Sequence, residues 1–93
     1  MLRVVAKVKL KPGCKARFFA EAEELVQKSQ TDEGCGFYGI WQLSSQEDTV
    51  AFLEEWRSQE ELDQHMKTEH FTRICPVLEQ FYDGPMLLDI FVQ

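Results

Sequence analysis

The chain has 93 residues, enough for one domain over residues 1–93, and its 44% hydrophobic and 28% charged residues are typical of a globular protein. A formal net charge of −6 argues against a nucleic-acid partner, because affinity for a phosphate backbone comes mainly from clustered Lys and Arg. No apolar run approaches the roughly 20 residues of a membrane helix and no signal peptide opens the chain, so we expect a cytoplasmic protein without a membrane partner.

The first quarter of the chain predicts a strand followed by a helix. Residues 2–11 alternate between apolar and polar side chains, which is the pattern of a half-buried strand. Pro12 and Gly13 predict a turn. Apolar side chains then recur at helical spacing over residues 14–30, and the polar stretch 31–36 ends this amphipathic helix.

A second predicted strand, residues 37–44, is apolar on both faces. Phe37, Trp41 and Leu43 share one face with Gly39, while Tyr38 and Ile40 share the other. The helices of the chain can cover only one of these faces. We therefore expect the other face to pack against a second copy, which gives a homodimer through the sheet faces.

The second half of the chain predicts a strand, a divided helix and a last strand. Residues 49–57 place Glu54 and Glu55 on opposite faces of a strand, which argues against a paired-carboxylate site. Ser58 and Glu61 form a capping box for a helix over residues 59–67. A further helix restarts around Thr68, Pro76 is expected to kink or break it, and residues 86–92 read as a strand.

This order of elements, βαββαβ with a divided second helix, predicts an α+β fold of the ferredoxin-like class. Such a fold has a four-stranded antiparallel sheet with its helices on one face. The three cysteines, Cys14, Cys35 and Cys75, are widely spaced and form no CxxC motif, so we expect free thiols rather than disulfides or a zinc site.

Chemistry-bearing residues concentrate between residues 52 and 71, which hold Trp56 and the only two histidines, His65 and His70. The histidines are five positions apart, or about 140° around a continuous helix, which is not the i, i+4 spacing of a metal-binding pair. No other segment carries a motif for a metal, a phosphate or a nucleophile, and we expect no metal.

Several segments together resemble the antibiotic biosynthesis monooxygenase family of small dimeric α+β barrel proteins. The resemblance spans nearly the whole chain and is carried by VVAKVKLKPG at 4–13, EGC at 33–35, FLEEW at 52–56, and His65 followed by TEHF at 68–71. Family members include cofactor-free oxygenases of polycyclic or quinol substrates, haem-degrading enzymes and an isomerase of a phosphorylated signalling molecule. The resemblance thus implies the fold more firmly than the reaction.

Departures from the family patterns reduce the number of reactions that the resemblance implies. The Asn and His that haem-degrading members use are replaced here by Ala6 and Cys75, which argues against haem degradation. The Asn and Tyr that contact substrate in anthrone-oxidising members are replaced by Phe52 and Leu62. The resemblance therefore implies a simpler quinol-type oxygenase that acts with O2 and without a cofactor.

The candidate site residues follow from the needs of that chemistry, which are a dry aromatic pocket and a base. His65 is the candidate base, with Trp56 beside it, and His70 or Arg73 is the candidate donor to a substrate oxygen. Phe37, Phe52 and Phe71 are the candidate stacking surfaces for an aromatic substrate.

Two other functions remain open at this point. One is isomerisation of a small phosphorylated dicarbonyl with a His as proton shuttle. The other is a non-catalytic dimeric binding or stress-related module, in which Trp56 and His65 are packed core residues.

Overall fold

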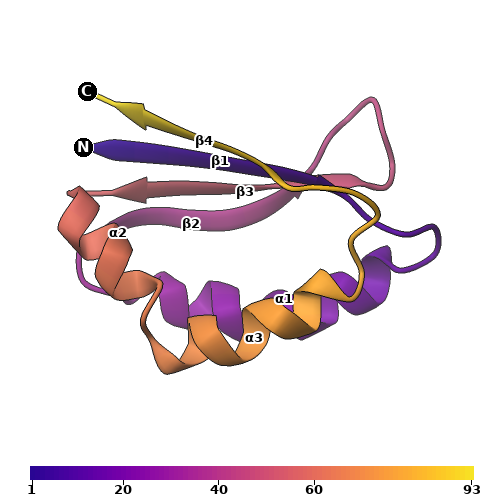
Figure 1. Ribbon diagram of the computed structural model, residues 1–93, viewed down its shortest axis with the longest axis horizontal. Coiled ribbons are helices and arrows are strands. Elements are labelled where there is room, and N and C mark those ends of the chain that lie inside the picture. The colour runs from indigo at the N-terminus through magenta and orange to yellow at the C-terminus, as the bar shows by residue number, and fades with distance from the viewer.

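The computed structural model describes residues 1–93 as two layers, a sheet and three helices that lie against one of its faces (Figure 1). The elements in chain order are β1 (Leu2–Lys9), α1 (Lys15–Ser29), β2 (Cys35–Gln42), β3 (Thr49–Trp56), α2 (Gln59–His65), α3 (Glu69–Glu79) and β4 (Leu87–Val92). All three strand pairs are antiparallel, in the order β2-β3-β1-β4. The predicted ferredoxin-like fold is confirmed.

The core lies between the sheet and the helices α1 and α3, which run side by side beneath it (Figure 1). From β1 the core takes Val4, Ala6 and Val8, the face that the alternating pattern predicted. The helices contribute Phe18, Ala22, Leu25, Ile74 and Leu78. No helix is long and apolar enough to cross a membrane.

The strand β4 lies at one edge of the sheet and all six of its residues are exposed. Its pairing with β1 places Leu88 and Ile90 beside Ala6 and Val4, on the helix side of the sheet. Leu88 is nevertheless 58% exposed. The helix side of β4 is therefore an open flank of the apolar interior.

The predicted division of the second helix, with a restart around Thr68, is confirmed. The helix ends at His65 and restarts after Thr68, whose hydroxyl accepts from the Phe71 N–H. The break expected at Pro76 is absent, because α3 continues through it. Pro76 and Thr72 are both exposed, so the Thr72 carbonyl that lost its donor faces water and the helix tolerates the proline.

The capping box at the start of α2 is formed in part. The Ser58 hydroxyl accepts from the Glu61 N–H, as predicted. The Glu61 carboxylate accepts from the guanidinium of Arg57 and from the Ser58 hydroxyl instead of the Ser58 backbone. Arg57, which the sequence places at the strand end, thus competes for the capping carboxylate as the stronger, charged donor.

Candidate functional site

An apolar cavity of about 440 Å³ lies between the helix side of the sheet and the helices α2 and α3. Twelve of its fifteen lining residues are hydrophobic, and none is Lys or Arg. Leu88 and Ile90 of the open edge strand β4 form one side of it, so the cavity reaches solvent along that flank. The size and lining are typical of a site for a small organic molecule.

His65 forms part of the cavity wall at the end of α2, and its ring is held by aromatic side chains. The ring lies 4.5 Å from the indole of Trp56, 5.1 Å from Phe71 and 5.3 Å from Tyr38, measured between centroids. His65 is fully buried. Burial lowers the pKa of His65, while the hydrogen bond and the charge of Asp32 act in the opposite direction, so the ring is neutral at neutral pH.

The two ring nitrogens of His65 have different surroundings. Nδ1 lies 2.8 Å from Oδ2 of Asp32, in the loop after α1. Nε2 is buried and has no hydrogen-bond partner within the protein. The same Oδ2 also lies 2.8 Å from Nε2 of His70, in the first turn of α3.

The structure therefore brings His65 and His70 together, contrary to the expectation based on a continuous helix. The break between α2 and α3 redirects the chain, so that both histidines reach the Asp32 carboxylate and their ring centroids lie 6.2 Å apart. Their nitrogens and that carboxylate lie within 4.8 Å of one another, a donor set that suits a divalent metal.

The separations within this group favour hydrogen bonds over a metal site. Ligand atoms around a tetrahedral ion at about 2.1 Å lie about 3.4 Å apart. Both nitrogen-to-oxygen distances here are 2.8 Å, the length of a hydrogen bond. We therefore treat Asp32, His65 and His70 as a hydrogen-bonded cluster.

Glu54 is a second titratable residue that lines the cavity. It points to the helix side from β3, and it accepts a hydrogen bond of 2.8 Å from the indole N–H of Trp56. Burial raises the pKa of Glu54 to about 6, and the Trp56 hydrogen bond opposes this increase. Its carboxylate can therefore gain or lose a proton near neutral pH.

Cys75 also lines the cavity. Burial raises the pKa of its thiol to about 11, so the thiolate needed for nucleophilic chemistry is scarce at neutral pH. All three cysteines are free thiols, as predicted.

The remaining candidate residues divide into three groups. Phe52 and Phe71 line the cavity together with His65. Trp56 is completely buried behind His65 and is not part of the lining, so it reaches the cavity only through its contacts with His65 and Glu54.

Phe37 and Arg73 lie away from the cavity. Phe37 is 46% exposed on the outer face of the sheet, since its neighbour Tyr38 takes the helix side. Arg73 is an exposed residue of α3 and pairs with Glu24 and Glu69. Neither can contact a molecule in this cavity within one chain.

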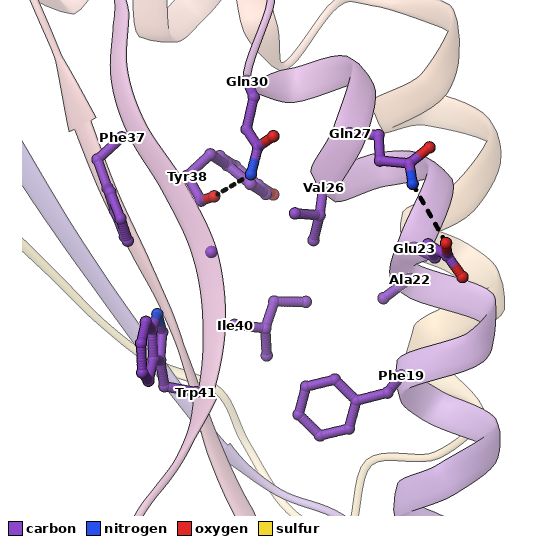
Figure 2. A pocket seen from close by; sticks show the side chains of 11 residues that line it. Phe19, Ala22, Glu23, Val26, Gln27, Gln30, Phe37, Tyr38, Ile40 and Trp41 are labelled. Atoms are coloured by element: carbon purple, nitrogen blue, oxygen red, sulfur yellow. Dashed lines mark hydrogen bonds between the residues drawn. The ribbon is translucent and has the colours of Figure 1, made fainter.

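A second hollow of about 470 Å³ lies between α1 and the edge strand β2 (Figure 2). Figure 2 shows Ile40 facing Phe19 and Val26 of α1, with Phe37 and Trp41 on the opposite side of β2. The amide of Gln30 donates to the Tyr38 carbonyl at 3.1 Å and satisfies part of this strand edge. This hollow has no histidine, and Glu23 is its only carboxylate, so it is the weaker candidate for chemistry.

Comparison with known proteins identifies the relatives of the chain. Residues 1–76 match the model of the antibiotic biosynthesis monooxygenase family. A Bacillus subtilis (strain 168) protein named "Putative monooxygenase YcnE" is 34% identical over 86 residues, which cover 92% of this chain and 90% of that protein.

Two solved structures share the fold over nearly their whole length. A conserved protein from Methanosarcina mazei Go1 superposes with a TM-score of 0.93 at 33% identity, covering 97% of this chain and 89% of that one. A structure described as an antibiotic biosynthesis monooxygenase gives a TM-score of 0.92 at 28% identity, covering 100% of this chain and 98% of the other.

Proposed function

Since the chain belongs to the antibiotic biosynthesis monooxygenase family, we propose that it is a cofactor-free monooxygenase that oxidises a small aromatic, quinol-type substrate with O2. The observation that carries this proposal is the apolar cavity whose wall contains a buried histidine with one free ring nitrogen. In this reaction the protein has two tasks, which are to remove a phenolic proton and to exclude water.

His65 is the proposed base. Its ring is neutral at neutral pH, and its Nε2 has a lone pair that no protein group uses. A buried acceptor without a partner costs about 1–3 kcal/mol, which a phenolic O–H of the substrate would recover. Phe52 and Phe71 are the proposed stacking surfaces for the substrate ring.

The electron-rich phenolate then passes an electron to O2, and recombination places a peroxide on the ring carbon. Loss of water from the peroxide leaves a carbonyl. Overall, a phenol and O2 give a quinone and H2O. The substrate gains one oxygen atom and loses two hydrogen atoms, and the second oxygen atom of O2 leaves with these hydrogens as water. Glu54 is the proposed group that returns a proton to the departing oxygen, since its pKa of about 6 allows it to cycle.

The charge of the cavity favours this substrate class over a phosphorylated dicarbonyl. A phosphate needs cationic or several backbone donors, and the cavity lining contains neither Lys nor Arg. Arg73, the cation nearest to the histidine segment in sequence, is engaged by two surface carboxylates. A neutral phenol needs no cation and fits an apolar lining.

We also propose a homodimer and a cytoplasmic location. The outer face of the sheet exposes Phe37 and Trp41. A second copy would cover these apolar side chains, and family members are often dimeric. The wide spacing of the three cysteines, which form no CxxC motif, supports a reducing compartment.

Oxygen uptake by the purified protein with a panel of quinols, naphthols and anthrones tests the proposed activity. We expect turnover with at least one member, and a decrease of about 100-fold in His65→Ala, the contribution of one general base. Glu60→Gln, an exposed change on the same helix, is the matched control and should keep full activity.

Either of two results would contradict the proposal. The first is no oxygen uptake with any compound of the panel, and the second is full activity in His65→Ala. Saturable binding of these compounds without oxygen uptake would favour the non-catalytic binding module instead.

A further inference from the structure

We propose that Asp32 is a positioning residue that holds His65, a residue of the cavity wall, as the tautomer with its proton on Nδ1 and thereby keeps the Nε2 lone pair free. This inference rests on the proposed role of His65 as the base. It assigns a functional role to a loop residue that does not line the cavity.

The first support is the chemistry of the contact. An ionised carboxylate can only accept hydrogen bonds, so the 2.8 Å contact of Asp32 Oδ2 with Nδ1 of His65 requires the proton to lie on Nδ1. In a neutral imidazole the other nitrogen then has a lone pair. Without this contact, nothing in the protein distinguishes the two tautomers, because Nε2 has no partner of its own.

The second support is that the Asp32 carboxylate itself is fixed from another side. Nε2 of His70 lies 2.8 Å from the same oxygen, and an ionised carboxylate can only accept in this contact. Asp32 and His70 are both largely shielded from solvent, with side chains 15% and 12% exposed. Two N–H donors on one carboxylate oxygen hold that oxygen in place beside His65.

The third support is the rigidity of the loop that carries Asp32. The Asp32 carbonyl accepts from Cys35 N–H at 3.1 Å, and the Gly34 carbonyl accepts from Arg57 N–H at 2.8 Å. Gly34 has a φ of +82°, and a Cβ there would lie 2.4 Å from the Glu61 carboxyl group. The left-handed φ of Gly34 favours glycine at this turn. The Gly34–Arg57 hydrogen bond ties the Asp32 loop to the residue that follows β3 and precedes α2.

Nitrogen-15 NMR of the histidine side chains, on the full chain without substrate, tests this inference directly. In the wild type we expect His65 Nδ1 to show a bonded proton and Nε2 to show the signal of an unprotonated nitrogen. In Asp32→Ala we expect a substantial population with the proton on Nε2. Glu33→Gln is the matched control, because it removes the same charge one residue away, at an exposed side chain, and should leave the His65 signals unchanged.

Kinetics on an active substrate give a second readout. We expect Asp32→Ala to lower kcat about 100-fold, as the loss of a correctly protonated base does, with KM within about twofold of the wild type. If Asp32→Ala does not fold, Asp32→Asn carries the test, since its amide can either donate to Nδ1 or accept from it and should give a mixture of tautomers.

The inference is overturned if wild-type His65 has its proton on Nε2, or if the folded Asp32 variants keep the wild-type tautomer. These outcomes are independent of turnover, because the tautomer is measured without substrate. Failure of the proposed monooxygenase activity is seen separately, as an absence of oxygen uptake by a wild type whose His65 tautomer is as expected.

Discussion

The indole N–H of Trp56 donates to the carboxylate of Glu54 at 2.8 Å. The largest fully buried side chain of the protein thus forms a hydrogen bond with a titratable group at the cavity. Because this hydrogen bond favours the ionised form, it keeps the pKa of Glu54 from rising above about 6. We expect Trp56→Phe, which lacks the donor, to raise that pKa further. Carbon-13 NMR titration of the Glu54 carboxyl measures it, and an unchanged or lower pKa would contradict this role of Trp56.

The raised pKa of Glu54 also makes the stability of the protein depend on pH. The pKa of the carboxyl is 4.5 in the unfolded chain and about 6 in the folded protein, so the folded state binds the proton more tightly. The free energy of unfolding therefore decreases as pH rises through this interval, by about 2 kcal/mol from this group.

Glu54→Gln removes that penalty and retains an oxygen that accepts from Trp56. We expect the variant to gain about 2 kcal/mol over the wild type at pH 7.5 and little at pH 4.5. Urea denaturation at both pH values measures this, and Glu55→Gln on the opposite face of β3 is the control. A Glu54→Gln effect of equal size at both pH values would show that the carboxyl is not perturbed.

Leu88 offers a way to fill the cavity without disturbing the core. It lines the cavity from the exposed edge strand, so Leu88→Trp should narrow the space while the protein stays folded. We expect weaker binding of a naphthol probe, by about tenfold or more, measured by fluorescence titration. Phe91→Trp places an indole on the outer face of the same strand and should leave the affinity unchanged; equal affinities of both variants would place the binding site elsewhere.

Trp41 tests the proposed dimer. It is 60% exposed on the outer face of the sheet, where a partner would cover it. We expect the wild type to be a dimer by light scattering and Trp41→Glu to shift it to monomer, because burial of an unpaired charge is costly. Gln42→Glu, one residue along and on the other face, should remain dimeric, and a monomeric wild type would contradict the dimer.

His70 tests the cohesion of the cluster around Asp32. We expect His70→Ala to reduce the free energy of unfolding by about 1.5–3 kcal/mol, the range for hydrogen bonds to charged groups. His70→Gln retains an N–H donor of similar reach and should lose less. Thermal or urea denaturation compares the two variants, and equal losses would mean that the contact with Asp32 at 2.8 Å contributes little.

Much of the architecture follows from the sequence, because periodicity is a local property. Alternation over residues 2–11 and helical spacing over residues 14–30 each predict an element and its buried face, and the structure has these elements at residues 2–9 and 15–29. The cap residues Ser58 and Thr68 mark two helix starts for the same local reason. The break wrongly expected at Pro76 shows the limit of such rules, since solvent around an exposed turn can replace a lost hydrogen bond.

The candidate site was predictable only in part. The sequence indicated His65, Phe52 and Phe71, which do line the cavity, because they cluster with apolar residues in one segment. The sequence placed Phe37 and Tyr38 on opposite faces of a strand, but it did not indicate which of these faces the helices cover. The sequence placed Glu54 and Glu55 on opposite faces of a strand. Which of the two is buried depends on which face the helices cover.

What the sequence determined by itself is therefore the set of elements, their apolar faces and the family to which the chain belongs. Tertiary structure alone decided that Asp32 meets His65 and His70, which lie 33 and 38 residues further along the chain. The physical reason is that such a contact depends on the direction in which α3 leaves the break after α2 and on the packing of the loop after α1. The spacing of residues along one element determines neither the direction of α3 nor the packing of that loop.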